Sequence, residues 1–86
     1  MNIYFFNEDA QPPAFLKKTV REIAKKIALE EQKNIKSVNI IFCSDNYLLE
    51  INKEYLNHDY FTDIITFDYA QDNQITSDIF ISVDRI

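Results

Sequence analysis

Acidic residues and a histidine in the second half of the chain could together bind a metal ion. His58 is the one histidine of the sequence, and it stands beside Asp59 in a polar segment. A catalytic zinc ion usually takes three protein ligands, most often histidines, and keeps another position open for water. One histidine cannot supply that pattern, so we expect His58 to be an exposed loop residue and expect no metal site in this chain.

Carboxylates form a second candidate site, an oxygen site for magnesium in a nuclease of the two-metal type. The residues concerned are Asp59, Asp63, Asp68 and Asp78. Asp63 and Asp68 are separated by an odd number of residues, which points their side chains to opposite faces of a regular strand. Turn and strand-edge positions explain these carboxylates more simply, and the magnesium nuclease is kept as an alternative.

A group of basic residues could bind RNA. Its members are Lys17, Lys18, Arg21 and Lys25. On a helix they lie within about 100° of one another, so their side chains could contact successive phosphates. The alternative is a solvated helix face that binds nothing, steadied by Glu22 and Lys26 at the favourable i,i+4 spacing.

Cys43 is the single cysteine, so the chain forms no internal disulfide and no multi-cysteine zinc cluster. It ends an apolar run and has no histidine near it in the sequence. A reactive cysteine needs an environment that stabilises the thiolate, whereas a cysteine in an apolar run is typically buried and inert. We therefore expect a buried structural thiol.

The composition restricts the possible classes of protein. The 86 residues suffice for one small domain, and 47% of them are hydrophobic, as in globular proteins. A net charge of −5 argues against binding nucleic acid through overall charge alone. Glycine is absent, which excludes the glycine-rich phosphate loops. No apolar stretch is long enough for a membrane helix and the N-terminus lacks the features of a signal peptide, so we expect a cytoplasmic protein without a membrane partner.

The elements that must position these residues follow from hydrophobic periodicity. Strands are expected over residues 3–6, 37–43, 63–69 and 77–83, and helices over residues 14–31 and 46–56. The apolar stripe of the first helix comprises Leu16, Val20, Ile23, Ala24 and Ile27. The order β-α-β-α-β-β predicts an α/β (α+β) fold with a small, mixed, four-stranded sheet in a single domain, residues 1–86.

Polar residues should end these elements. Asn34 is the expected C-terminal signal of the first helix, and Ser44 or Asp45 is the expected N-cap of the second. Residues 70–74 are expected to connect the last two strands, with Asp72 and Asn73 as the turn. Asn and Asp are the residues that best tolerate a positive φ where glycine is absent.

Several strands are apolar at successive positions, as in residues 40–43 and 79–81. Such strands are apolar on both faces, and a sheet made of them needs cover on both sides. Only two helices are expected, and the second is short. We therefore expect part of one sheet face to lack its cover.

Two blocks resemble the YbeY endoribonuclease family of rRNA maturation factors. That family carries Leu-Asn-x-x-Tyr-x-x-x-Asp-x-x-Thr-Asp-Val-Leu-Ser-Phe and then Gly-Asp-Ile-x-Ile-Ser. The matching residues are Asn52, Tyr55, Asp59, Thr62, Asp63, Phe67, Asp78, Ile79, Ile81 and Ser82. Two positions differ, because Leu56 stands where many relatives have an Arg thought to contact substrate and Ser77 replaces the motif glycine.

The resemblance implies a single-strand-specific, zinc-dependent endoribonuclease in ribosomal RNA maturation and ribosome quality control. The family binds zinc through three histidines of a His-Gly-x-x-His-Leu-x-Gly-x-Asp-His motif on a later helix and turn. This sequence lacks that motif, so it resembles the N-terminal portion of such a domain without the metal-binding helix. We expect the 86 residues to be inactive on their own.

The resemblance also gives expectations for the site and the partners. The expected cleft wall consists of Asn52, Tyr55, His58, Asp59, Thr62 and Asp63, with Asp78 and Ser82 on the supporting strand. The expected partners are ribosomal RNA and ribosomal proteins. The rival interpretation is a non-catalytic module that binds RNA or a ribosomal protein through the basic helix.

Overall fold

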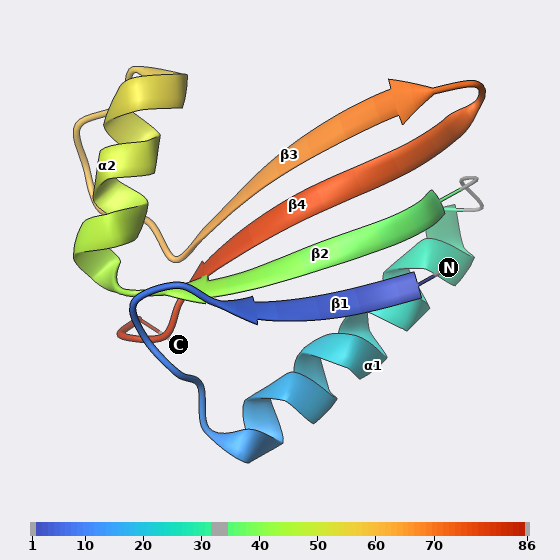
Figure 1. Cartoon of the computed structure of the whole chain (residues 1–86), viewed down its shortest axis with the longest axis horizontal. Helices are drawn as coiled ribbons and strands as arrows, with labels where there is room; N and C mark the ends of the chain where they lie inside the picture. The colour runs from blue at the N-terminus through green and yellow to red at the C-terminus, as the bar shows by residue number, and fades with distance from the viewer. Residues whose placement is uncertain (1, 32–34, 86) are drawn as a thin grey trace.

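A computed structural model of the chain describes residues 2–31 and 35–85, without the side chains of residues 27–31 (Figure 1). Its elements are β1 (Asn2–Asn7), α1 (Ala14–Glu31), β2 (Ile35–Cys43), α2 (Asp45–Leu56), β3 (Ile64–Gln71) and β4 (Gln74–Ser82). They form one four-stranded sheet in the order β1-β2-β4-β3. β1, β2 and β4 run parallel, and β3 runs antiparallel to β4. The expected mixed α/β architecture is confirmed.

The two helices pack against opposite faces of the sheet. Leu16 of α1 belongs to a buried cluster with Val38, Ile40 and Phe42 of β2. Leu48 of α2 belongs to a second cluster with Cys43 and Ile65. Because alternate residues of a strand point to opposite faces, these clusters lie on the two sides of β2. Among the described residues, neither helix combines the length and the apolar character needed to cross a membrane.

The boundaries of α1 agree with the prediction, but its apolar stripe is narrower than expected. Leu16 is buried and Val20 is half-buried, whereas 52% of Ile23 is exposed. Leu16, Val20 and Ala24 follow the i,i+4 row that faces the sheet, and Ile23 lies beside that row. The prediction for Ile23 is wrong; the predicted signal at Asn34 and the side chain of Ile27 lie outside the described residues.

Because the chain has no glycine, asparagine and aspartate occupy the left-handed positions of its turns. Asp72 and Asn73 have φ angles of 52° and 64°, so the predicted turn residues are confirmed. The predicted loop over residues 70–74 is too long, since β3 continues to Gln71 and β4 starts at Gln74. Asn57 adopts a left-handed conformation with φ 56° and ends α2. The hydroxyl of Ser44 accepts a hydrogen bond from the Tyr47 N–H at 3.1 Å, which selects Ser44 as the N-cap.

One sheet face is only partly covered, as expected. Phe5 packs into the cluster under α1, so its neighbours Tyr4 and Phe6 point to the other face, and each is 49% exposed. On β3, 55% of Tyr69 is exposed. Helix α2 stands at the end of the sheet where β2 and β4 finish (Figure 1). Within residues 2–31 and 35–85, no helix lies above the aromatic side chains on the rest of that face.

Candidate functional site

The loop over residues 57–63, between α2 and β3, is held by one buried side chain. The Asn52 amide is 2% exposed, and its Nδ2 donates to the Tyr60 carbonyl oxygen at 2.8 Å. The Asn52 carbonyl oxygen accepts from the N–H groups of Asn57 and His58, the latter at 3.0 Å. One residue therefore binds three positions of the loop and folds it back along α2.

At the other end of the loop, polar residues gather where the parallel strands finish. The Ser82 N–H donates to the Asp63 carbonyl oxygen at 3.0 Å, and the Ser82 hydroxyl donates to Asp45 Oδ1 at 3.3 Å. Arg85 Nε donates to Asp45 Oδ1 at 2.6 Å, and the Asp45 N–H donates to Asp84 Oδ2 at 2.9 Å. The carboxyl edge of parallel strands is the usual place for ligands in sheets of this kind.

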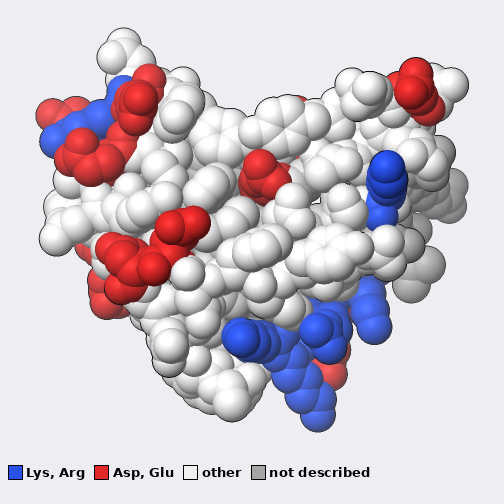
Figure 2. All heavy atoms as spheres, in the orientation of Figure 1, with Lys and Arg blue, Asp and Glu red and all other residues white. Residues whose placement is uncertain are grey.

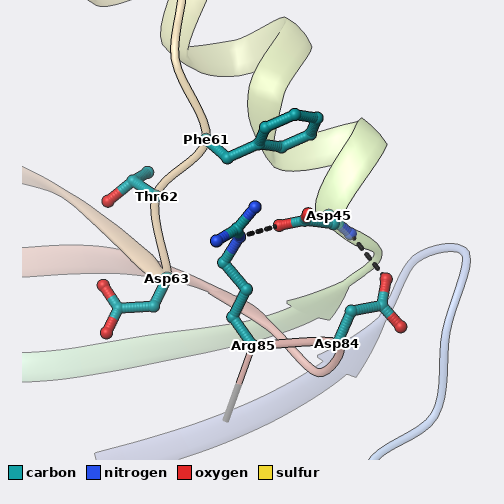
Figure 3. A pocket seen from close by; sticks show the side chains of 6 residues that line it. All are labelled: Asp45, Phe61, Thr62, Asp63, Asp84 and Arg85. Carbon is teal, nitrogen blue, oxygen red and sulfur yellow. Dashed lines mark hydrogen bonds and ion pairs between the residues drawn. The ribbon is translucent and has the colours of Figure 1, made fainter.

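Figure 3 shows the open pocket that these groups form, about 680 Å³ in volume. Its lining residues are Asp45, Phe61, Thr62, Asp63, Asp84 and Arg85. The Arg85 guanidinium carbon lies 4.9 Å from the centre of the Phe61 ring, within range of a cation–π interaction. The hydrogen bond to Asp45 raises the pKa of Arg85, which keeps the guanidinium charged. Carboxylates outnumber this cation, so the pocket does not attract phosphate through its own charge.

A second contact joins this edge to the loop after β1. The Ser44 N–H donates to Asp9 Oδ1 at 2.7 Å, and the Ser44 hydroxyl donates to Asp9 Oδ2. The hydrogen bond from the Ser44 hydroxyl lowers the pKa of Asp9, so the carboxylate stays ionised near neutral pH. Asp9 therefore links the loop that precedes α1 to the N-terminal end of α2.

Four of the six residues predicted for the cleft wall occupy three different places. Thr62 and Asp63 line the pocket at the strand ends. Tyr55 lines a separate groove, together with Ile51, Phe67, Tyr69, Asp78 and Phe80. Asn52 is buried beneath the loop, where it holds the backbone.

His58 and Asp59 follow the C-terminal end of α2, a helix about 18 Å long that begins at the strand ends. His58 Nδ1 pairs with the Tyr60 hydroxyl at 3.0 Å, and the two rings stack. Asp59 lies 3.6 Å from the ammonium group of Lys53, and its side chain is 82% exposed. The expectation that His58 is an exposed loop residue is confirmed.

The carboxylates of the magnesium alternative do not gather. Asp68 accepts from the Ser77 hydroxyl at 2.6 Å, and Asp78 accepts from Asn39 Nδ2 at 2.9 Å. Ser77 and Asp78 are neighbours on β4, so these two pairs lie on opposite faces of the sheet. Asp59 stands apart from both, beyond α2. The structure thus contradicts a shared oxygen site of these residues.

The four basic residues of α1 divide into two kinds. The Arg21 guanidinium carbon lies 5.0 Å and the Lys17 ammonium nitrogen 6.0 Å from the centre of the Phe5 ring. These two side chains therefore cover part of β1 as well as carrying charge. Lys18 and Lys25 are exposed. Figure 2 shows the basic side chains over α1 and most of the visible acidic ones at the opposite end, over α2.

Several residues of the strand-end pocket were not predicted. Asp45, Asp84 and Arg85 owe their proximity to the parallel pairing of β2 with β4, which aligns Cys43 with Ser82. The available signal was the polar residues soon after each strand, Asp45 after β2 and, beyond Val83, Asp84 and Arg85 after β4. Because the carboxyl ends of parallel strands share one edge, such residues can meet there.

Cys43 is completely buried, and its thiol lies 3.6 Å from the Ile81 carbonyl oxygen. Burial raises the pKa of the thiol from an ordinary value of 9.0 to about 12, and nearby carboxylates such as Asp9 add to the shift. The thiol is therefore neutral at physiological pH, and the expectation of a buried structural cysteine is confirmed.

This shift predicts a pH dependence of stability. Above pH 9 the unfolded thiol ionises while the folded one stays protonated up to about pH 12. The contribution of Cys43 to stability is thus fully present below pH 9. As the pH rises above 9, the free energy of unfolding should fall by about 1.4 kcal/mol per pH unit. Urea unfolding between pH 8 and 10.5 measures this fall. The Cys43→Ser variant serves as the control, and an equal fall in that variant would show that other groups cause it.

Zinc does not fit the residues that the structure describes. Across residues 2–26 and 35–85, no three His, Cys, Asp or Glu side chains are arranged to hold a metal ion. His58, the one histidine, has its Nδ1 paired with Tyr60 and stands away from the strand-end pocket. No catalytic step through zinc can be derived for these residues.

Comparison with known proteins supports the family resemblance that the two motif blocks indicated. A family described as "Endoribonuclease YbeY" matches residues 3–86. A relative from Parabacteroides distasonis with that name is 48% identical over 86 residues, which is 100% of this chain and 61% of the relative. One from Cytophaga hutchinsonii is 47% identical over 85 residues, 98% of this chain and 59% of the relative. The chain thus spans about three-fifths of the length of these relatives, and it belongs to the endoribonuclease YbeY family.

Proposed function

We propose that this chain functions as part of a single-strand-specific, zinc-dependent endoribonuclease. The enzyme would mature ribosomal RNA and take part in ribosome quality control in the cytoplasm. The observation that carries the proposal is the family match over residues 3–86, which includes both motif blocks. Relatives named endoribonuclease are 42% to 48% identical over the whole chain. The zinc ligands would come from the three-histidine motif of the family, which is not among these 86 residues.

In this proposal, the residues described here bind and position RNA. Lys18 and Lys25 project from α1 and contact phosphates, while Lys17 and Arg21 add charge from their places over Phe5. The loop over residues 57–63 presents Thr62 and Asp63 at the strand-end pocket. The hydroxyl and the carboxylate there can accept hydrogen bonds from ribose hydroxyls, which distinguish RNA from DNA.

The exposed basic face of α1 also supports a second candidate, a module that binds RNA or a ribosomal protein without cleaving it. A binding module needs the charge of α1 and no metal centre. The two candidates differ once the family's histidine motif is joined to the chain, because only the endoribonuclease then cleaves RNA.

The test uses a single-stranded RNA labelled with a fluorophore and the 86-residue chain. Reversing two charges in Lys18→Glu/Lys25→Glu should weaken binding at least tenfold at low salt. It should also reduce the slope of log K against log salt by about 1.4, since each single-strand phosphate contact contributes about 0.7. Fluorescence anisotropy at several salt concentrations measures both quantities.

The matched control, Lys36→Glu/Lys53→Glu, makes the same change in net charge away from α1. If the control loses RNA affinity equally, the effect comes from overall charge and not from α1. If neither variant loses affinity, the basic side of α1 is a solvated face that does not bind RNA. We also expect the chain to leave the RNA intact and to hold less than stoichiometric zinc by elemental analysis. Cleavage by these 86 residues, with zinc or with magnesium, would contradict the division of roles.

A further inference from the structure

β1 lies at one edge of the sheet and, within residues 2–31 and 35–85, pairs with a strand on one side only (Figure 1). An edge strand leaves a row of backbone N–H and C=O groups that can pair with a further strand, and folded proteins usually protect it with a charged side chain, a proline or a bulge. β1 contains no charged residue and no proline, and its pairing with β2 is continuous over all six residues. β3, at the other edge, carries Asp68 within the strand. β1 is therefore the less protected edge.

The register of β1 identifies the backbone groups that face outward. The Glu8 N–H, directly after β1, donates to the Phe42 carbonyl oxygen of β2 at 2.9 Å. The N–H and C=O groups of one residue point to the same side of a strand, and this side alternates from residue to residue. Tyr4 and Phe6 therefore direct these groups to β2, as Glu8 does. The outward groups are those of Ile3, Phe5 and Asn7.

Two cations stand beside this edge, on the side of the sheet where α1 packs. The Arg21 guanidinium carbon lies 5.0 Å and the Lys17 ammonium nitrogen 6.0 Å from the centre of the Phe5 ring, so both side chains reach from α1 to β1. Both residues are exposed, and among the described residues neither forms an ion pair with a carboxylate. Figure 2 shows basic side chains gathered along the edge where Figure 1 places β1 and α1. A ligand at this edge should carry negative charge.

The two sides of β1 differ in chemistry. Tyr4 and Phe6 alternate with the residues that face α1, and each is 49% exposed. Successive side chains of an added strand would also point alternately to the two sides of the sheet. On one side they would meet Lys17 and Arg21, and on the other they would lie beside the two half-exposed aromatic rings. An extended peptide in which acidic and apolar residues alternate complements both sides.

We propose that the outer edge of β1 binds an extended segment of another protein in which acidic and apolar residues alternate. The segment adds a strand to the sheet, a mode of recognition in which backbone hydrogen bonds supply affinity and alternate side chains supply specificity. It pairs antiparallel, the more stable arrangement, so its acidic residues lie directly opposite Ile3, Phe5 and Asn7 and exchange hydrogen bonds with them.

The charge of the edge and its backbone groups favour this occupant over two others. A second copy of β1 has no acidic residue to place beside Lys17 and Arg21. RNA phosphates can accept from the outward N–H groups, but they supply no donor for the outward C=O groups. The proposal does not depend on the proposed ribonuclease function.

Fluorescence anisotropy with labelled, end-blocked peptides and the 86-residue chain tests the binding. Glu-Val-Glu-Val-Glu-Val should bind at least tenfold more tightly than Glu-Glu-Glu-Val-Val-Val, which has the same composition and charge but cannot keep its acidic residues on one side. Methylation of the glutamate backbone nitrogens should abolish binding, whereas methylation of the valine backbone nitrogens, which point to solvent, should not. No binding of the alternating peptide up to about 1 mM would overturn the proposal, as would equal binding within either pair of peptides.

Variants of the chain assign the binding to the edge of β1. Lys17→Glu/Arg21→Glu should weaken binding of the alternating peptide at least tenfold. The matched control is Lys18→Glu/Lys25→Glu, which makes the same change in net charge on the same helix and should have a much smaller effect. Asn7→Pro removes an outward N–H and places the proline ring in the path of the added strand, so it should weaken binding without changing the circular dichroism spectrum. An equal loss in the two charge variants would show that the peptide responds to overall charge alone and would refute the proposal.

Amide hydrogen exchange locates the bound peptide. The amides of Ile3, Phe5 and Asn7 should exchange more slowly when the alternating peptide is bound, whereas those of Tyr4 and Phe6, which already pair with β2, should change little. Protection elsewhere but not at the outward amides would show that the peptide does not extend the sheet. If single-stranded RNA protects the outward amides and the peptide does not, the edge of β1 serves RNA and the proposal is wrong.

Discussion

Asn52→Asp is expected to lower the free energy of unfolding at pH 7 by about 3–5 kcal/mol, since it leaves a buried charge without a partner. The Asn52 Nδ2 group donates to the Tyr60 carbonyl oxygen at 2.8 Å, and the side chain is 2% exposed. A carboxylate in its place would direct a negative charge at that oxygen. Urea unfolding of the variant and the parent chain measures the difference.

The stability lost in Asn52→Asp should increase as the pH rises. Burial without a donor raises the pKa of the new carboxyl group above its unfolded value of about 3.9. Below that value the group is neutral in both states and can donate to the Tyr60 carbonyl as the amide does. The penalty should therefore be small at pH 3.5 to 4 and should grow as the pH rises, when variant and parent are compared at each pH.

Asn46→Asp is the matched control, because Asn46 is exposed in the first turn of α2, where the helix dipole favours a negative charge. It should leave stability unchanged or raise it slightly. Amide hydrogen exchange should show the loop over residues 57–63 opening faster in Asn52→Asp alone. If both variants lose the same stability, Asn52 does not hold the loop as described.

Phe42→Ala is expected to cost about 3–5 kcal/mol, the range for removing a buried aromatic side chain and leaving a cavity. Phe42 is 0% exposed in β2, and its ring stacks against that of Phe5 with centres 6.0 Å apart. Natural domains are stable by about 0.05–0.15 kcal/mol per residue, so a chain this short loses much of its stability. Urea unfolding followed by circular dichroism measures the loss.

Phe15→Ala makes the same chemical change at a 70% exposed position and should stay within about 0.5 kcal/mol of the parent chain. An equal loss at both positions would show that Phe42 is not the centre of the core. Arg21 and Lys17 lie over the ring of Phe5. Phe42→Ala should therefore also loosen the basic edge of α1, with faster exchange of its amide hydrogens.

The sequence alone determined the order and type of the elements, because these depend on neighbours along the chain, and the predicted ends lie within three residues of the observed ones. The i,i+4 apolar row of α1 gave its bounds, Ala14–Glu31, correctly. The turn at Asp72 and Asn73 was predictable because, without glycine, few residues tolerate a positive φ. The motif blocks around Thr62 and Asp63 were sufficient to recognise the family, which the match over residues 3–86 confirms.

The tertiary structure decided which of these residues share a site. Asn52, Tyr55 and Thr62 belong to one motif block, yet they lie under the loop, in the aromatic groove and at the strand-end pocket. Arg85 joins Asp45 because β2 and β4 pair in parallel and end at one edge. Local periodicity determines secondary structure, whereas strand order and register depend on packing between distant segments, so the strand-end pocket could be found only in the folded chain.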